Sequence, residues 1–146
     1  MTESVPRIEQ FLDERAISWK RLDVHGWGAL WKRWLLIYGR MFEPGTRRKQ
    51  GNKARHELGQ LTADGFLILA IPDVRVVPFA GNTRRGFAYE CAFEEPSPVL
   101  DLSQISGCDI VQCASDFAWT MVHTHEDDGW GGPFFSRSEW QEAGDP

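Results

Sequence analysis

The spacing of apolar residues in the first part of the chain predicts helices. Ile8, Phe11, Leu12 and Ala16 recur three and four positions apart after Pro6, a residue that suits a first helical turn. A longer apolar stripe at helical spacing follows, made of Trp27, Leu30, Trp31, Trp34, Leu35 and Tyr38. Its three tryptophans are expected in the core, because aromatic side chains bury the largest area per residue.

A third helix is predicted after a basic segment, with Asn52 as its N-terminal cap. Its apolar positions are Ala54, Leu58 and Leu61. The segment at residues 47–55 holds five basic residues in nine, but its glycine spacing and the asparagine in place of a lysine do not fit a phosphate-binding loop. The basic run is interpreted as a solvated face, with a patch for an anion or an acidic partner as the alternative.

From Gly65 onward the apolar residues follow strand spacing instead. Residues 66–71 form a continuous apolar run bounded by turn residues, which predicts a strand buried on both faces. The other expected elements are a short strand at 74–77, a half-buried strand with an acidic outer face at 87–94, a helical turn at 100–105, and an antiparallel hairpin of strands 108–113 and 117–125.

Helices come first along the chain and strands come second. This order predicts an α+β fold, with N-terminal helices packed on one face of a mainly antiparallel sheet formed by the C-terminal half. At 146 residues the chain is expected to be a single domain, 1–146, with residues 136–146 as a flexible tail. No apolar run approaches the length of a membrane span and no signal-peptide pattern is present, so the expected compartment is the cytoplasm.

Charge is distributed unevenly along the chain. Residues 1–60 hold 12 Lys and Arg against 7 Asp and Glu, which gives +5, whereas residues 61–146 hold 4 against 14, which gives −10. An acidic surface repels phosphate backbones, so the expected partner is a basic protein and not a nucleic acid. The three cysteines, Cys91, Cys108 and Cys113, form no Cys-x-x-Cys pair and are expected to be reduced and buried.

The strongest functional signal lies at residues 116–135, where an aromatic strand leads into an acidic, glycine-rich loop. Trp130 stands between glycines, so it either folds back over the sheet or projects as an aromatic anchor beside neighbouring acids. An exposed aromatic residue with charged surroundings is typical of a protein-binding hot spot. The candidate partner contacts are therefore Glu126, Asp127, Asp128 and Trp130, with Glu94 and Glu95 as a second acidic patch.

A metal site is the alternative interpretation of the same segment. His123 and His125 lie two positions apart on the predicted strand and share a face, so Asp127 could complete a site with one position open for water. The simpler explanation is that these residues end the strand and bond to the loop backbone. No spacing selects a nucleophilic triad, and the sequence assigns no catalytic residue and no cofactor.

Four short motifs carry a family resemblance. With Asn52-Lys-Ala-Arg55, Asp116-Phe-Ala-Trp-Thr120, Thr124-His-Glu126 and Gly132-Pro-Phe-Phe135, the chain resembles a bacterial family of small uncharacterised proteins known as domain of unknown function 4275. The likeness covers about residues 27–136. It implies a small cytoplasmic α+β domain without an assigned activity, cofactor or catalytic residue.

Taken together, these features predict a small acidic protein-binding module. The expected function is that of an immunity-type inhibitor, which neutralises a cognate bacterial toxin by direct binding. The alternative is a metal-binding protein or metal-dependent hydrolase centred on His123 and His125, and a third possibility is an adaptor with no toxin partner. The grounds for the first are the single compact domain, the acidic C-terminal half, the seven tryptophans and the lack of a catalytic constellation.

Overall fold

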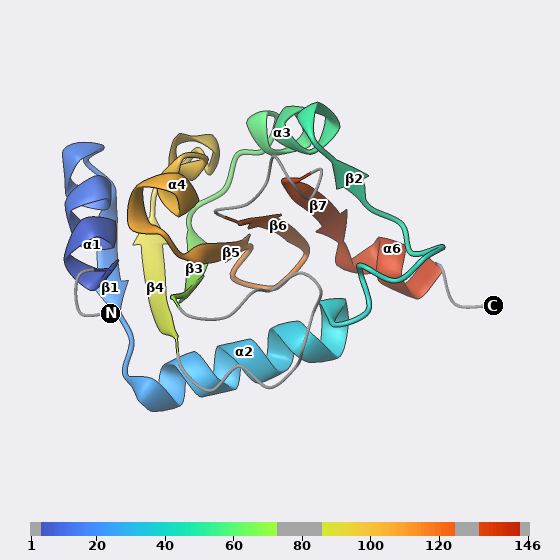
Figure 1. Cartoon of the computed structure of the whole chain (residues 1–146), viewed down its shortest axis with the longest axis horizontal. Helices are drawn as coiled ribbons and strands as arrows, with labels where there is room; N and C mark the ends of the chain where they lie inside the picture. Colours follow the sequence, from blue (N-terminus) through green and yellow to red (C-terminus); the bar gives the residue numbers. More distant parts are fainter. Residues whose placement is uncertain (1–3, 73–85, 125–131, 144–146) are drawn as a thin grey trace.

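The computed structural model describes residues 4–72, 86–124 and 132–143, and their arrangement is shown in Figure 1. The helices are α1 (Ser4–Glu14), α2 (Val24–Tyr38), α3 (Asn52–Gly59), the short 3-10 helix η1 (Ser97–Val99), α4 (Leu102–Ser106) and α6 (Ser138–Ala143). The strands are β1 (Ser18–Arg21), β2 (Lys49–Gln50), β3 (Phe66–Ile71), β4 (Phe87–Ala92), β5 (Asp109–Cys113), β6 (Trp119–His123) and β7 (Phe134–Arg137).

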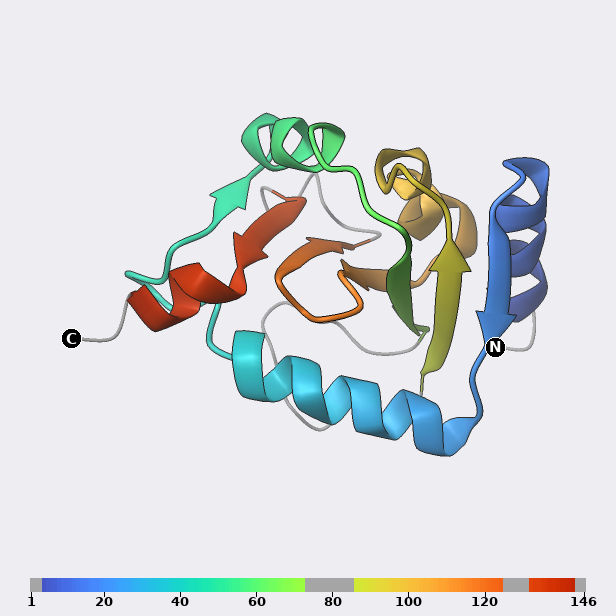
Figure 2. The ribbon, with the colours of Figure 1, turned by 180° about the vertical axis from the view of Figure 1, so that it is seen from behind.

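The strands of the described segments form one sheet in the order β1-β4-β3-β5-β6-β7-β2, in which all neighbours are antiparallel. The predicted α+β class is therefore confirmed, and so is the hairpin, which appears as β5 and β6. Two strands were not foreseen in the N-terminal half, and they form the two edges of the sheet. Figure 2 shows β1 beside β4 at one edge and β2 beside β7 at the other.

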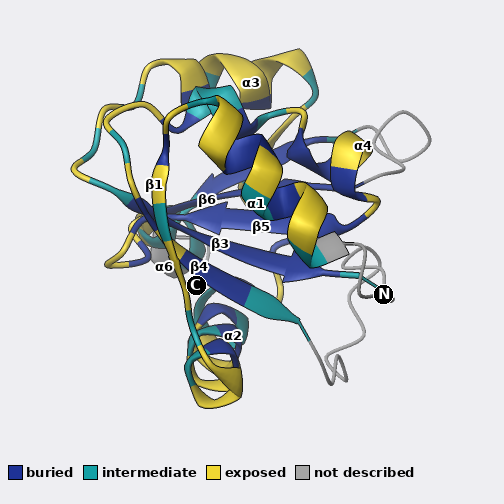
Figure 3. Cartoon of the chain, turned by 90° about the vertical axis from the view of Figure 1, so that its left-hand side faces the viewer, coloured by how far each residue is buried: buried dark blue, intermediate teal, exposed yellow. Residues whose placement is uncertain are grey.

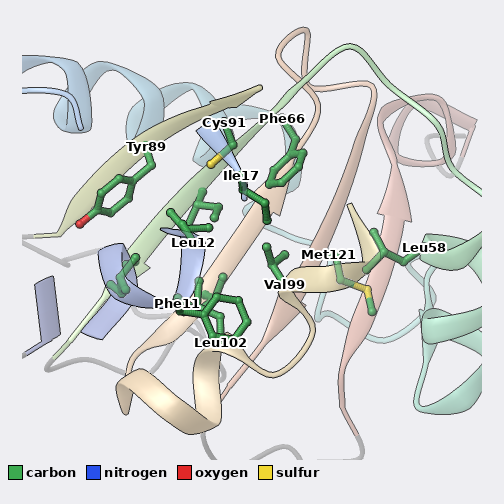
Figure 4. Close-up of a cluster of buried hydrophobic side chains, with 14 of the residues drawn as sticks. Phe11, Leu12, Ile17, Leu58, Phe66, Tyr89, Cys91, Val99, Leu102 and Met121 are labelled. Carbon is green, nitrogen blue, oxygen red and sulfur yellow. The ribbon is translucent and has the colours of Figure 1, made fainter. Parts of the chain in front are cut away.

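Helices cover both faces of the sheet, with α1, α3 and α4 on one face and α2 on the other (Figure 3). The expectation that they cover a single face is wrong. The reason is the central strand β3, in which all six side chains are buried, so that both faces need an apolar cover. Figure 4 shows the first of these covers, where Phe11 of α1 lies beside Leu102, and Leu58 of α3 lies beside Met121 of the sheet.

On the other face, the tryptophan stripe of α2 forms the core that its spacing predicts. Trp27 stacks on Trp31 and Trp31 stacks on Trp34, with ring centroids 5.4 and 5.3 Å apart. The indole Nε1 of Trp34 donates a hydrogen bond to Thr120 Oγ1 at 2.9 Å, and the hydroxyl of Tyr38 donates to the Phe117 carbonyl at 2.6 Å. These bonds fix α2 to the β5–β6 hairpin.

The ends of the N-terminal helices depart from the sequence-based expectations. α1 stops before Ala16, which is exposed and has a φ of 57°, outside the helical region. Asn52 does not cap α3 but is its first residue, because the chain turns at Gly51, whose φ of 64° favours glycine. α2, by contrast, has a side-chain cap, since the Asp23 carboxylate accepts a hydrogen bond from the Gly26 amide at 2.8 Å.

The segment expected as a flexible tail belongs in part to the fold. Ser136 and Arg137 end β7, and the following residues form α6, where Trp140 packs edge-on against Phe135 with centroids 6.0 Å apart. This aromatic contact explains why the chain does not leave the sheet at position 136. The strand expected at 74–77 lies outside the described residues.

Candidate functional site

Most of the residues chosen as partner contacts lie outside the described residues. This applies to Glu126, Asp127, Asp128 and Trp130, so their role stays a prediction. The second acidic patch is described: Glu94 and Glu95 follow β4 and are both exposed. The Ala63 amide donates a hydrogen bond to the Glu94 carbonyl at 2.9 Å, which holds this patch beside the turn that leads into β3.

An open groove of about 520 Å³ runs between the middle of α2 and the strands β1, β4 and β3. Lys20 and Glu90 face each other across the β1–β4 pair, and the half-buried Leu30 of α2 forms part of the wall. Among the described residues, the lining consists of Ser18, Trp19, Lys20, Leu30, Asp64, Gly65, Phe66, Leu67, Glu90, Cys91, Ala92 and Ser115. With two carboxylates, one ammonium group and the Glu94 and Glu95 patch near its Asp64 end, the groove carries a net negative charge.

Gly65 is required where the groove meets β4. A Cβ atom at this position would lie 2.7 Å from the carbonyl oxygen of Cys91, which is closer than real Cβ atoms come to backbone. The absence of a side chain therefore lets the turn before β3 approach β4 directly. This close approach forms the end of the groove.

The strand beside the groove has one edge without a strand partner among the described residues. β1 ends the order of the sheet and pairs only with β4, and Ser18, Lys20 and Arg21 are exposed on it. Arg21 forms a salt bridge with Glu9 of α1 at 3.0 Å, so α1 holds the strand in place from one side. A smaller hollow of about 380 Å³ lies where α1 leads into β1. An extended peptide can add to an edge of this kind through backbone hydrogen bonds.

His123 is a second unusual feature. Its side chain is 1% exposed, and neither ring nitrogen has a hydrogen bond of good geometry in the described part of the chain, although the Leu100 backbone faces the ring. Burial first, and then the charge of Arg55, lower the pKa of His123 from 6.5 to about 4, and the facing Leu100 backbone offsets only part of this effect. The ring is therefore neutral near pH 7.

No group of three or more potential metal ligands gathers within residues 4–72, 86–124 and 132–143. His125 and Asp127, the other residues of the metal interpretation, lie outside these ranges. The metal alternative thus stays a prediction, and the described structure supplies only His123 to it.

The cysteines are free and buried, as expected from their spacing. Burial raises the pKa of the Cys91 thiol to about 12 and also raises the pKa of Cys113. Thiolates are the reactive form of cysteine, so these side chains are inert packing groups at neutral pH.

This burial predicts the behaviour of the thiols toward Ellman's reagent. Native protein at about pH 8 should release almost no chromophore over minutes, whereas the denatured protein should react at all three cysteines. Absorbance during the reaction measures both states. A native thiol that reacted as fast as free cysteine would contradict the buried placement.

The sheet, its two helical covers and the acidic groove define an α+β protein with a concave, charged edge. Comparison with known proteins gives no match: no protein-family profile, no curated protein and no solved structure is similar to the chain at a significant level. The resemblance to domain of unknown function 4275 therefore stays a prediction.

Within the described segments, no helix combines the length and the apolar character needed to cross a membrane.

The groove could not have been found from sequence patterns. Its lining comes from short segments of β1, α2, β3, β4 and the β5–β6 turn, which are far apart along the chain. The one available signal was the acidic outer face expected for β4, and Glu90 is indeed exposed there. β1 itself gives no signal, because Trp19 is its only apolar residue.

Proposed function

We propose that the protein is a protein-binding module of the immunity type, which neutralises a bacterial effector by binding it directly. The acidic groove carries this proposal, together with the adjoining edge of β1, which has no strand partner among the described residues. The proposed occupant is an extended, basic segment of the partner. Its backbone would add to β1, and its Lys or Arg side chains would lie near Asp64 and Glu90.

The charge pattern supports a basic occupant over an acidic one. Asp64 and Glu90 line the groove, and Glu94 and Glu95 extend the negative charge beyond its end, whereas Lys20 is the one lining cation among the described residues. Such charges steer association and make it sensitive to salt. The predicted loop contacts at Glu126, Asp127, Asp128 and Trp130 remain part of the proposal as a second contact.

Charge reversal in the groove tests this function. Asp64→Lys/Glu90→Lys should weaken partner binding by roughly tenfold or more, with the largest effect at low salt, because both changes oppose a basic ligand. Partners are captured from native lysate with tagged protein, and the affinity for the captured protein is then measured by calorimetry. Asp101→Lys/Glu139→Lys, at exposed positions away from the groove, is the matched control and should bind normally.

A growth assay decides whether binding is inhibition. The captured protein, expressed alone, should stop growth of the host, and co-expression with the wild-type chain should restore it. A harmless partner, or equal protection by the groove variant, would overturn the proposal. Asp127→Lys/Asp128→Lys in the same assay tests the acidic loop separately.

A further inference from the structure

The start of α3 presents backbone donors without acceptors. The cap residue Gly51 supplies no side chain, and in the described part of the structure the amides of Asn52, Lys53 and Ala54 have no hydrogen-bond acceptor. Ala54 is 0% exposed, so its donor is buried. The Gly51 amide itself donates to the Pro133 carbonyl at 2.8 Å, which fixes this end of the helix to the start of β7. Orphan amides of this kind form the anion sites of many helix N-termini.

The charges in this first turn have the wrong sign for a helix start without a ligand. No acid is present there, while Lys53 and Arg55 add positive charge to the positive end of the helix dipole. Neither side chain forms a salt bridge with a described residue, because the nearby Glu57 pairs instead with Lys49 at 3.8 Å and Arg137 at 3.6 Å. The positive end of the helix and the two cations repel one another, whereas a bound anion would attract all three.

His123 lies on the sheet beneath the same helix end. Val122 pairs with Phe134 and Phe134 pairs with Gln50, so the next residue on each strand brings His123, Pro133 and Gly51 into one row. His123 points to the α3 face, since it is two positions from Met121, which packs in one cluster with Ala54 and Leu58. Figure 4 shows Met121 and Leu58 next to each other.

The contacts of His123 support the same placement. Arg55 acts electrostatically on its ring, which sets the two side chains near each other, and the Leu100 backbone is the one hydrogen-bonding group that faces the buried ring in the described residues, without a bond of good geometry at either nitrogen. Buried polar groups without partners are rare in folded proteins and call for an explanation. A neutral imidazole keeps one N–H, which can donate to an anion.

We propose that the start of α3 is a binding site for a phosphate group carried by a small molecule or free in solution. The amides of Asn52, Lys53 and Ala54 and the His123 ring form its floor, in which Ala54 and His123 are buried, and the exposed Lys53 and Arg55 side chains form its rim. The number of donors favours phosphate over a carboxylate, because phosphate offers three strong acceptor oxygens. The site belongs to the β7–β2 side of the sheet and does not depend on the groove at β1.

Titration of ¹⁵N-labelled protein with inorganic phosphate tests the site. The amide resonances of Asn52, Lys53 and Ala54 should shift saturably, with a dissociation constant on the order of 1 mM at low ionic strength. Phenyl phosphate in a parallel titration separates a phosphate group on an organic molecule from free phosphate. Acetate at equal ionic strength should bind at least tenfold more weakly.

Two variants and a control give the result its meaning. Lys53→Gln/Arg55→Gln should raise the dissociation constant for phosphate at least tenfold, and His123→Leu should raise it more than His123→Gln, which keeps an N–H donor. Lys32→Gln/Arg40→Gln removes the same charge at exposed positions elsewhere and should bind as the wild type does.

The proposal is overturned by an absence of saturable shifts at the three amides, or by equal phosphate affinity in the Lys53→Gln/Arg55→Gln variant and the wild type. A folded spectrum is required of each variant. Since Lys53 and Arg55 are exposed, their replacement should not disturb folding, and this variant decides the matter even where His123→Leu does not fold.

Discussion

Replacing Trp34 by alanine should lower the free energy of unfolding by about 3–5 kcal/mol, the usual cost of removing a large buried aromatic side chain. Trp34 is 0% exposed and stands at the centre of the α2 core, stacked on Trp31 and bonded to Thr120. Because domains of this size are stable by only about 5–15 kcal/mol, the variant should unfold at a much lower urea concentration. Urea titration followed by circular dichroism measures the change.

A smaller change separates packing from hydrogen bonding at the same place. Trp34→Phe keeps an aromatic ring but removes the N–H that Thr120 Oγ1 accepts, so a further loss of about 1 kcal/mol beyond the lost volume is expected. Leu36→Ala is the control on the same helix, because Leu36 is 80% exposed and its loss should change stability by less than about 0.5 kcal/mol. Equal effects of Trp34→Ala and Leu36→Ala would refute the core assignment.

Acidification should destabilise the protein through His123. The unfolded chain takes up a proton on this residue as pH falls below 6.5, whereas the folded protein does so only near pH 4. The unfolded state therefore binds more protons than the folded state between these two pH values. The contribution of the neutral His123 to the free energy of unfolding is complete above pH 6.5 and is lost as the pH falls from 6.5 to about 4. At about 1.4 kcal/mol per pKa unit, the loss amounts to about 3 kcal/mol.

The pH effect is measured as a difference between variants, because carboxylates also titrate in this range. Between roughly pH 7 and pH 4, the wild type should lose about 3 kcal/mol more than His123→Gln in phosphate-free buffer. His56→Gln, which removes an exposed histidine from α3, is the matched control and should behave like the wild type. If His123→Gln and the wild type lost stability in parallel, the ring would not be buried in its neutral form.

The long, strongly periodic elements were the ones that the sequence predicted correctly. The α2 stripe and β3 carry enough apolar residues for their period to be unambiguous. β1 and β2 were missed because they are short, polar edge strands whose place is set by pairing with distant partners. The end of β7 and α6 were missed because Trp140 lies in a polar segment, and its contact with Phe135 is visible only in three dimensions.

For the candidate sites too, the sequence identified single residues but not the neighbours that the fold places beside them. The sequence singled out His123 because of its spacing to His125, a metal argument, whereas its isolation beneath α3 is a property of packing. Glu94 and Glu95 were chosen for their charge and are exposed, but the groove near them is assembled from segments that no sequence pattern connects. Charge and spacing thus identified single residues such as Glu94 and His123. Which other residues lie beside them is set by the pairing of the strands and could be seen only in the structure.

The proposed groove and the proposed phosphate site lie at opposite sides of the sheet. The groove adjoins β1, at one end of the strand order, and the phosphate site adjoins β7 and β2, at the other end. Their charges are also opposite, with carboxylates in the first and cations in the second. Variants at one site should therefore leave binding at the other unchanged, which makes the two proposals separately testable.

The N-terminal segment ties the two ends of the sheet together. β1 forms one edge, β2 forms the other, and α2 crosses the face between them, as Figures 1 and 2 show. An edge strand that frays by itself would normally exchange its amide hydrogens quickly. Only two residues separate β1 from α2, and the hairpin holds this helix through Trp34 and Tyr38, so the β1 edge can leave the sheet only if the start of α2 moves with it. Slow hydrogen exchange should therefore extend to β1, which should open together with the start of α2 rather than by itself.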